Sequence, residues 1–457
     1  MKKKVLIIIN SELYVRNYLK KNIFDLLQKK YDVYYLFNKS IKNTKVIKKL
    51  KNFKGYYKYT DTLNKLHTRN FNVIMWRFRK LSKSFQFRIK WFSEIEFSNF
   101  PKNKIKEFEL IYFKILQILK FRIYIQFFGS KIIYPIYKYF FIDRLEINKN
   151  LQKKIQIIKP NIIILPTQSQ TPCDNDIGKI SLQEKIKTLF IVDNWDNLSD
   201  KSKIIYQPDY ITVWGQQTKE HAIRIQGISS DRIFKVGTPR FDNYFRIRNN
   251  KIKNIFNFRY ILFLGTALKF NEERVIKEIN SILSGKPFNK KIKLLYRPHP
   301  WRMSKETINL KDLQNVVIDP QIKNNYNKKN IDLSFQPSLD YYPALIKNSE
   351  FVVGGLTSMI IESLIFYKKY IISALPEKTF NNQYNSLLYH EHFKELKKVK
   401  DIEICTDLKY LKQQMIKVYN LRKNIDKVKT DSIRNYFLYN NRFKFNKNLH
   451  NIIKKIT

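Results

Sequence analysis

The stretch FVVGGLTSMIIESLIFYKKYIIS, residues 351–373, contains the pattern from which most of this chain is built. An apolar run ends in Gly354 and Gly355, a Thr-Ser pair follows, and a helical pattern begins at once. A second apolar run, YIIS, closes the stretch. Apolar runs without polar alternation, joined by helices, are typical of parallel strands that are buried on both faces of a sheet. Residues 351–373 therefore predict a strand, a helix and a second parallel strand.

The same pattern recurs in two groups, and each group predicts one doubly wound α/β sheet. In the first group, the apolar runs lie at residues 4–10, 31–37, 161–167, 188–193, 210–214 and 233–237. In the second group, they lie at residues 259–265, 291–300, 315–320, 349–355 and 369–373. The polar, basic stretch RIRNNKIKN (246–254) separates the groups and is expected to be the linker. We predict one Rossmann-like domain at residues 1–248 and a second at 249–457, which ends in a helical tail.

The composition limits the class of protein. The 457 residues include 87 Lys and Arg against 38 Asp and Glu, a formal net charge of +49. Such a charge attracts anionic partners, among them nucleotide sugars, phospholipid headgroups and nucleic acid. Because the lysines are spread along the whole chain and no nucleic-acid motif occurs, a nucleic-acid-binding protein is the remote alternative. Two cysteines cannot form a disulfide framework, and no apolar run has the length of a spanning helix, so we expect a cytoplasmic protein.

Residues 76–150 interrupt the alternation of strands and helices. Lys and Arg are mixed here with Phe, Tyr, Ile and Trp, and we expect helical insertions in the first domain. Basic, aromatic helices can lie in a membrane interface, where each basic residue near an anionic surface contributes about 1 kcal/mol. The alternative is that these helices pack on the sheet and turn lysine-rich faces outward. Both interpretations stay open, so a peripheral position on the inner face of the membrane is considered as well.

Residues that directly follow an apolar run are the candidates for function, because ligands of doubly wound sheets bind outside the carboxyl ends of the strands. After the run at 349–355, Gly355 allows a ligand to approach the backbone, and Thr357 and Ser358 offer hydroxyls at a helix start. Glu362 lies one turn further on the same helix face and is the candidate acceptor for ribose hydroxyls. A plain turn with a capping Ser or Thr is the alternative.

The string LLYRPHPWR predicts further donor-binding residues. Arg297, His299 and Arg302 follow an apolar run, where Arg can bind phosphate oxygens and His299 can donate a hydrogen bond or a proton. The alternative is that Arg297 pairs with a local carboxylate and His299 is an ordinary loop residue. Gly265 and Thr266 follow the first run of the second domain and are expected to face a phosphate or the transferred group.

The string VDNWDNLSDKS follows a run in the first domain and is rich in groups that bind hydroxyls or take a proton. Asp193 and Asp196 are the candidate bases, together with His299 as a catalytic candidate on the donor side. The acceptor-side candidates are Asn194, Trp195, Asn197 and Lys201. A cluster of Asx turns with Trp195 as a packing anchor is the alternative. The DND at 174–176 is expected to start a helix, and no metal-ligand spacing occurs, so no metal is predicted.

The chain resembles bacterial glycosyltransferases of the GT-B type that build surface polysaccharides, in the strings DNWDNLSDK, VWGQQTKEHAIRIQGISSDRIFKVGTPRFD, RPHP and GGLTSMIIESLIFYKKY. The resemblance covers about residues 160–373 with the first strand and helix, and excludes residues 76–150 and the tail. The HP and TS pairs are also similar to the sialyltransferase-like and CDP-glycerol glycerophosphotransferase-like families. In these families a Gly-Lys-Pro string usually follows the helix that carries the acidic residue corresponding to Glu362. Here that string reads Tyr-Lys-Lys, residues 367–369.

This resemblance implies a GT-B fold, two doubly wound Rossmann-like domains facing a cleft, and metal-independent sugar transfer. In those families the His of HP and the later Ser/Thr hydroxyls hold the donor phosphates, which here are His299, Thr357 and Ser358. Glu362 matches the acidic residue that binds the donor ribose. The implied partners are a nucleotide-sugar donor and a glycan or lipid-linked acceptor in polysaccharide or lipopolysaccharide synthesis, with no further cofactor. A CDP-polyol phosphotransferase and a UDP-sugar 2-epimerase-like enzyme are alternatives with the same fold.

Overall fold

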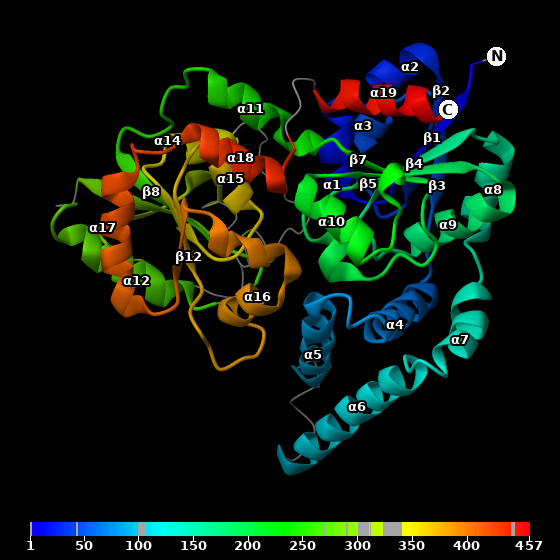
Figure 1. The fold of residues 1–457 in the computed structure, drawn as a ribbon, viewed down its shortest axis with the longest axis horizontal. Helices are drawn as coiled ribbons and strands as arrows, with labels where there is room; N and C mark the ends of the chain where they lie inside the picture. Colours follow the sequence, from blue (N-terminus) through cyan, green and yellow to red (C-terminus); the bar gives the residue numbers. More distant parts are fainter. Residues whose placement is uncertain are drawn as a thin grey trace. The chain divides into compact units, whose positions relative to one another are not determined.

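The apolar runs pair into two parallel sheets, and each sheet is the centre of one compact unit of the computed structural model (Figure 1). Unit 1 comprises Met1–Pro239, His390–His392 and Tyr439–Thr457, and unit 2 comprises Arg240–Tyr389 and Phe393–Leu438. The structure describes residues 2–42, 44–98, 107–268, 270–288, 291–299, 310, 312–322, 341–439 and 444–457.

Unit 1 is built on a seven-stranded sheet with the order β3-β2-β1-β4-β5-β6-β7. The strands are β1 (Lys4–Ile9), β2 (Asp32–Asn38), β3 (Phe53–Tyr57), β4 (Ile162–Thr167), β5 (Lys187–Val192), β6 (Tyr210–Val213) and β7 (Ile233–Lys235). Within β1, Val5, Ile7 and Ile9 belong to one core cluster, whereas Leu6 and Ile8 belong to another. Because side chains alternate along a strand, this division shows that both faces of the sheet are covered.

Helices on both faces of this sheet complete the core of unit 1. They are α1 (Glu12–Tyr14), η1 (Val15–Leu19), α2 (Asp25–Lys30), α3 (Thr44–Ile47), α8 (Lys149–Ile158), α9 (Pro172–Glu184), η3 (Asn197–Lys201), α10 (Gln216–Arg224) and α19 (Phe445–Ile456). In α19, Phe445, Leu449 and Ile453 recur on one helix face and are buried in the same cluster as Tyr18 and Leu27. The predicted division assigned the whole tail to the second domain, whereas its last helix packs in unit 1.

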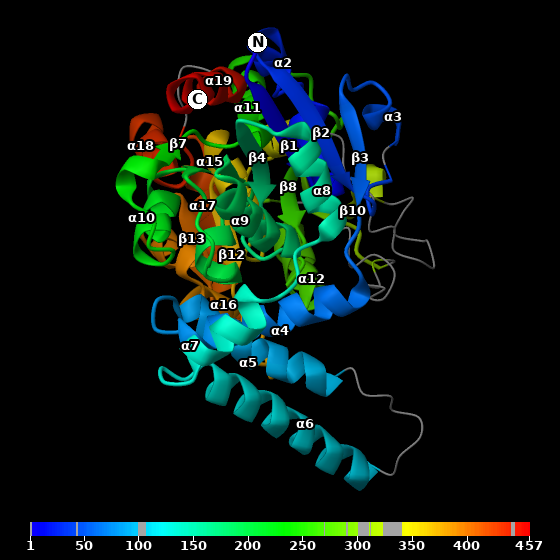
Figure 2. The same ribbon diagram turned by 90° about the vertical axis from the view of Figure 1, so that its right-hand side faces the viewer.

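The predicted helical insertion is present in unit 1 and begins earlier than expected. It consists of α4 (Asp61–Arg77), α5 (Lys83–Ser98), α6 (Glu107–Phe128), α7 (Tyr134–Tyr137) and η2 (Lys138–Asp143). The helices α4, α5 and α6 pack against one another around a small core, and α6 lies farthest from the sheet (Figures 1 and 2). In the part of the chain that the structure describes, none of the helices combines the length and the apolar character that crossing a bilayer requires.

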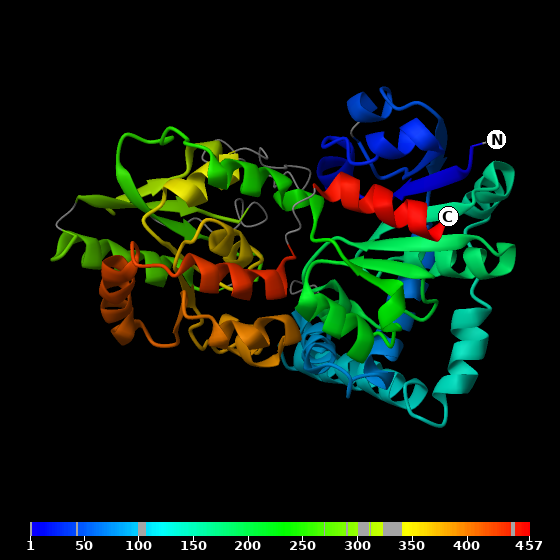
Figure 3. The same ribbon diagram turned by 45° about the horizontal axis from the view of Figure 1, so that its top comes forward.

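Unit 2 is built on a six-stranded sheet with the order β10-β9-β8-β11-β12-β13. Figure 3 shows this unit, mostly green, yellow and orange, in a tilted view. The strands are β8 (Arg259–Leu264), β9 (Ile292–Arg297), β10 (Val316–Ile318), β11 (Val352–Gly354), β12 (Tyr370–Ser373) and β13 (Ile402–Cys405). The helices include α11 (Asp242–Asn249), α12 (Glu272–Ser284), α14 (Tyr341–Asn348), α15 (Met359–Ile365), α16 (Gln383–Tyr389), α17 (Leu411–Leu421) and α18 (Lys427–Phe437).

The two sheets confirm the predicted α/β class with two doubly wound Rossmann-like halves. Each predicted apolar run forms a strand, and the DND motif lies in the first turn of α9, where Thr171 and Asp174 cap the helix reciprocally. The strands β3 and β13 were not predicted, because FKGYY and IEIC carry Lys, Gly or Glu within a short apolar run. Residues 246–249 of the expected linker form the end of α11.

Candidate functional site

Each sheet reverses its strand order at one point, which is where doubly wound folds bind ligands. In unit 2 this point lies between β8 and β11, and β9 lies on the other side of β8. The chain leaves β8 at Gly265, β9 just before His299, and β11 at Gly355. Because the three strands are parallel neighbours, residues that are far apart in the sequence meet at one edge of the sheet.

Gly265 and His299 lie in direct contact at this edge. A Cβ atom on Gly265 would lie 2.8 Å from the backbone nitrogen of His299 and 3.0 Å from the Cα of Pro298. The N–H of Gly265 donates to the carbonyl of Arg297 at 2.9 Å. Only a residue without a side chain allows the loops after β8 and β9 to approach this closely. The half-buried His299 is therefore positioned by Gly265, which was predicted separately from it.

A buried amide connects the loop after β8 to the loop after β11. Gln383 donates from Nε2 to the hydroxyl of Thr266 at 3.0 Å and accepts from the N–H of Leu356 at 2.7 Å. A Cβ on Gly355 would lie 2.9 Å from both that Nε2 and the Cγ2 of Thr266. Thr266 is buried and holds the loops together, instead of facing a phosphate with its side chain as predicted. The sequence gives no sign of Gln383, because the polar string FNNQYNS does not follow an apolar run.

Thr357 and Ser358 follow Gly355 at the same edge and are half-buried. The Thr357 hydroxyl lies 3.5 Å from the N–H of Met359, which is a marginal distance, and Ser358 makes no capping bond with its side chain. Helix capping therefore does not account for the Ser358 hydroxyl, and it contributes little for that of Thr357. Arg302, which was predicted beside them, lies outside the described residues.

Arg297 is held inside unit 2, contrary to the prediction that its guanidinium faces a phosphate. It is buried, forms an ion pair with Asp319 and donates to Gln321 Oε1 at 2.7 Å. Its guanidinium carbon also lies 3.9 Å from the ring centroid of Tyr342. A carboxylate, an amide and an aromatic ring thus surround the side chain. The alternative considered for Arg297, pairing with a local carboxylate, is the arrangement observed.

Glu362 is likewise engaged by protein groups, which does not fit the expected ribose-binding role. Its side chain is 1% exposed, pairs with Arg240 and accepts from the hydroxyl of Tyr244 at 2.5 Å. Burial, together with the charge of Glu362, raises the pKa of Tyr244, so this phenol remains a hydrogen-bond donor. The carboxylate therefore connects α15 to the start of α11 within unit 2.

In unit 1 the strand order reverses between β1 and β4. After these strands, Asn10 Nδ2 donates to the Thr171 hydroxyl at 3.4 Å. The hydroxyls of Ser11, Tyr14 and Ser169 are buried, and within the described part of the chain none of them makes a hydrogen bond. Buried hydroxyls without a protein partner indicate a bound water or a polar ligand. These serines were not predicted, although each follows an apolar run.

Asp193 is fully buried at the end of β5, which argues against its predicted role as a base. Its Oδ1 accepts from Asn17 Nδ2 at 3.2 Å, and its backbone N–H donates to the Thr167 carbonyl at 3.2 Å. Burial and the charge of Asp193 raise the pKa of Tyr18, whose ring lies close by. A base for an incoming hydroxyl must reach the substrate, so Asp193 fits better as a group that holds this sheet edge together.

Asn194, Trp195 and Asn197 form a turn and a packing anchor. The Oδ1 of Asn197 accepts from the N–H of Asn194 at 2.7 Å and closes the turn. Trp195 is buried and donates from Nε1 to Gln217 Oε1 at 2.6 Å. These three residues were predicted to bind the acceptor. The structure instead shows the alternative, an Asx turn with Trp195 as a packing anchor.

Asp196 and Lys201 of this string are half-buried and reach the surface, as Asn194 does. They form an ion pair of 3.0 Å, and about a quarter of each side chain is exposed, at 26% and 27%. Burial alone would raise the pKa of Asp196, but the charge of Lys201 and the hydrogen bond that Lys201 donates outweigh it and lower this pKa. Asp196 thus stays ionised at neutral pH and remains a candidate base.

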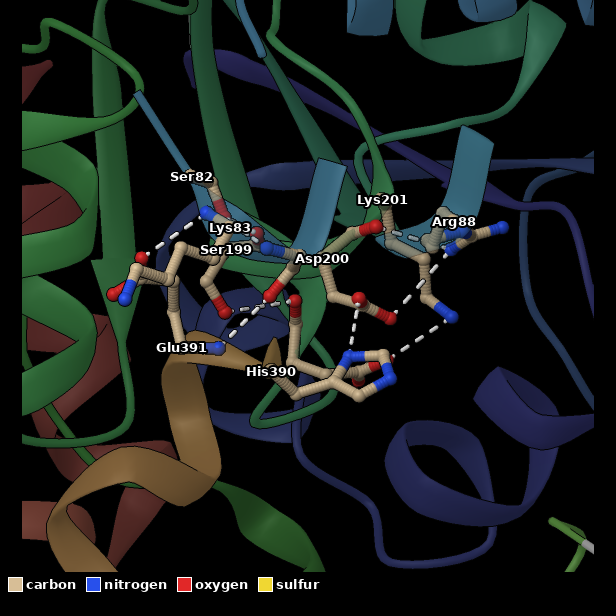
Figure 4. Close-up of polar contacts among 10 residues, drawn as sticks. Ser82, Lys83, Arg88, Ser199, Asp200, Lys201, His390 and Glu391 are labelled. Atoms are coloured by element: carbon tan, nitrogen blue, oxygen red, sulfur yellow. Dashed lines mark hydrogen bonds and ion pairs between the residues drawn. The ribbon is translucent and has the colours of Figure 1, made fainter. Parts of the chain in front are cut away.

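A histidine from late in the chain adds a second acid–base candidate to this edge (Figure 4). His390 Nδ1 lies 2.7 Å from Asp200 Oδ1, and Arg88 Nη1 lies 3.7 Å from Asp200 Oδ2. Burial opposes ionisation of Asp200, but the charges of His390 and Arg88 outweigh it and hold the Asp200 pKa well below its usual range. A carboxylate that fixes an imidazole is a common arrangement for proton transfer.

The segment that carries His390 is anchored on α5 through the next residue (Figure 4). The N–H of Glu391 donates to the hydroxyl of Ser84 at 2.9 Å, and its Oε1 accepts from the N–H of Lys83 at 3.1 Å. Arg224 adds an ion pair of 3.1 Å to the same carboxylate. Because Asp200 and His390 are far apart in the sequence, no local spacing could have predicted that they pair.

The described residues contain no group of three or more His, Cys, Asp or Glu that could hold a metal ion. A cavity of about 670 Å³ lies in unit 1 near Lys3, Asn161 and Lys187. These residues belong to the amino ends of the strands, so the cavity is separate from the residues described above.

No protein-family model matches the sequence, and no curated protein matches it. Among solved structures, the UDP-GlcNAc 2-epimerase from Neisseria meningitidis, bound to UDP-GlcNAc, is similar with a TM-score of 0.53, 10% identity and coverage of 99% of this chain and 100% of that one. The UDP-GlcNAc 2-epimerase from Methanocaldococcus jannaschii gives 0.51, 12% identity and 99% coverage of both chains. A glycosyltransferase from Rickettsia africae gives a TM-score of 0.48, 10% identity and coverage of 100% of this chain and 98% of that one. The neighbours are enzymes of the GT-B fold, and this chain has that fold.

Proposed function

We infer that the chain is a glycosyltransferase that moves a sugar from a nucleotide-activated donor to a glycan or lipid-linked acceptor in surface polysaccharide synthesis. The observation that carries this inference is the meeting of three loops at the strand-order reversal of unit 2. There, Gly265 and Gly355 allow the loops to pack closely, and His299, Thr357 and Ser358 are the half-buried candidates for phosphate binding. This is the edge where doubly wound sheets bind nucleotides.

In this proposal the donor phosphates are held by His299, Thr357 and Ser358. When the sugar leaves, negative charge develops on the nucleotide phosphate, and hydrogen-bond donors aimed at that charge lower the barrier. Arg297 and Glu362 have no part in it, because protein groups occupy their side chains. The carboxyl edge of unit 1 would take the acceptor, with Asp196 or His390 receiving the hydroxyl proton.

The experiment is a panel of UDP-, GDP- and CMP-sugars, scored by release of the nucleotide. His299→Ala should lower kcat by about 10²–10³-fold, which is the usual effect of removing one donor to a developing charge. His450→Ala is the matched control, because His450 lies in α19 of unit 1, whereas His299 belongs to unit 2. Turnover that is equal in the two variants would remove His299 from the site. Failure of every donor in the panel would count against the transferase itself.

A UDP-sugar 2-epimerase is the second candidate, and the similarity to two such enzymes over nearly the full length of all chains favours it. Inversion at C2 must break and remake the bond between C2 and its hydrogen, whereas sugar transfer leaves that bond intact. UDP-GlcNAc incubated with the protein in D₂O should therefore gain deuterium at C2 only for an epimerase. A CDP-polyol phosphotransferase would instead release CMP from CDP-glycerol without affecting either UDP- or GDP-sugars.

A further inference from the structure

The outer side of the insertion in unit 1 carries an unusual concentration of apolar side chains. Eight of the eighteen large apolar residues that are exposed in the described chain lie between residues 119 and 141. They are Leu119, Ile123, Phe127, Ile132, Ile136, Tyr139, Phe140 and Phe141. Their exposure ranges from 44% for Phe141 to 83% for Ile132. Monomeric proteins rarely expose a contiguous apolar surface of this kind unless it binds something.

This apolar surface is distinct from the face that packs inside the insertion. On α6, Ile125 is fully buried, and Tyr124 and Phe128 pack beside it on the α4 and α5 core. The rings of Tyr124 and Phe128 also contact Tyr137 of α7, at centroid distances of 6.3 and 5.0 Å. Phe141 and Phe127 adjoin this internal cluster, with ring centroids 5.0 Å from Tyr137 and 5.1 Å from Phe128, yet each is about half exposed. The exposed apolar surface therefore borders the internal core of the insertion.

The exposed residues of α6 follow helical spacing. Leu119, Ile123 and Phe127 recur every four residues, which gives one stripe on the helix. Beyond Gly129, Ile132 lies in the turn before α7, and Ile136 lies within α7. A helix that carries an apolar stripe on its exposed face as well as on its packed face is typical of a helix that also contacts a partner outside its own domain.

The positive charge of the same segment indicates a partner with a negatively charged surface. Residues 119–144 contain five Lys or Arg, namely Lys120, Arg122, Lys131, Lys138 and Arg144, against a single acidic residue, Asp143. The guanidinium of Arg144 lies 4.4 Å from the ring centroid of Tyr139, so apolar and cationic groups are interleaved. A second copy of the chain would set this positive surface against an equal one, which like charges disfavour. A surface of anionic lipid satisfies both features, because the rings enter the headgroup region while the cations meet phosphates.

We propose that residues 119–144 dock unit 1 on an anionic membrane surface. The apolar side chains of α6, α7 and η2 lie in the interface, and the basic residues contact lipid phosphates. The helix α6 lies along the surface and does not cross it. For an enzyme that uses a lipid-linked acceptor, such docking would hold the protein where the acceptor is, but the docking itself does not depend on any catalytic activity.

The test is sedimentation of the full chain with vesicles of phosphatidylcholine alone or mixed with phosphatidylglycerol, without substrate. Wild-type protein should bind the anionic vesicles and lose binding as salt rises. The triple variant Ile123→Ser, Phe127→Ser, Ile132→Ser should bind roughly tenfold more weakly or worse. The matched control is Ile157→Ser with Leu182→Ser, which removes apolar residues that are 71% and 66% exposed elsewhere in unit 1. This control should bind like the wild type.

A second variant separates charge from apolar contact. Arg122→Gln with Lys131→Gln should weaken binding to anionic vesicles about 25-fold, which is about fivefold for each basic residue. Equal binding of wild-type protein to neutral and anionic vesicles would overturn the proposal, and so would unchanged binding of the triple variant. Self-association of the wild type that the triple variant abolishes, without lipid binding, would also overturn it and identify a second copy as the occupant.

Discussion

Replacing Arg297 by Met tests whether its buried guanidinium stabilises the fold of unit 2 or binds the phosphate of a ligand. In this variant Asp319 loses its ion-pair partner but keeps its fully buried position. Removing one partner of a buried pair typically costs about 3–5 kcal/mol. Asp319 retains two donors, the Tyr341 hydroxyl at 2.7 Å and the Gln321 N–H at 3.0 Å. We therefore expect the lower end of the range, about 3 kcal/mol.

Hydrogen exchange of peptides from β9 and β10 measures this loss where it occurs. A loss of about 3 kcal/mol corresponds to exchange about 10²-fold faster, if these strands exchange by opening of the unit. Adding Asp319→Asn removes the unpaired charge and should restore part of the protection. Arg259→Met is the matched control, because Arg259 is about half exposed and its ion pair with Glu350, at 2.7 Å, is of the surface kind. Such pairs contribute about 1 kcal/mol or less.

The opposite pattern would refute this reasoning. If Arg297→Met left the exchange of β9 and β10 unchanged and abolished nucleotide binding, the guanidinium would have to leave Asp319 for a phosphate. The ion pair would then be a resting arrangement of the side chain. The predicted donor-binding role of Arg297 would be restored, and the structural role described above would be wrong.

Three further variants test other parts of the structure. Burial lowers the pKa of His67 from 6.5 to about 4, so the unfolded chain binds a proton that the folded chain does not, and stability falls by about 2 kcal/mol from pH 7 to pH 5. His67→Leu should reduce that loss in urea titrations at the two pH values, and an unchanged loss would contradict the assignment. Gln383→Leu leaves the N–H of Leu356 buried without its acceptor and should cost about 1–3 kcal/mol by thermal unfolding; an unchanged midpoint counts against the amide bridge. Gly265→Ala should displace the His299 backbone and lower activity, whereas Gly285→Ala, whose Cβ would meet only a carbonyl at 3.8 Å, should not; equal activities would show that the close approach is unimportant.

The sheets could be predicted from the sequence because their strands are buried on both faces. A run such as VLIII in β1 is apolar without alternation, which is typical of a parallel strand that is buried on both faces. The two strands that were missed lack this signature. β3 is only partly buried, and β13 carries a glutamate in its four residues. The position of α19 was also missed, because helical spacing shows which face is apolar but not which of two sheets covers it.

The candidate site was predictable only to the level of the sheet edge. Parallel strands bring their carboxyl ends together, so His299 and Gly265 could be expected at one edge from the apolar runs alone. What each side chain contacts there depends on partners from other elements. Arg297 and Glu362 carry the right chemistry for a nucleotide, yet Asp319, Arg240 and Tyr244 occupy them. No local pattern distinguishes a charged residue that awaits a ligand from one that has a buried partner.

The lowered pKa of Asp196 makes a prediction for the pH dependence of activity. This carboxylate stays ionised well below neutral pH, so a rate that depends on it should be flat from pH 8 to below pH 5. If Asp196 receives the proton, Asp196→Asn should lower turnover by about 10²-fold or more throughout this range. Because His392 and His67 are held neutral by burial, with pKa values of about 4, the fold itself weakens in acid. Rates at pH 5 must therefore be compared with the folded fraction at the same pH. Turnover that is unchanged in Asp196→Asn would exclude the carboxylate, and turnover that is unchanged in His390→Gln would exclude the histidine.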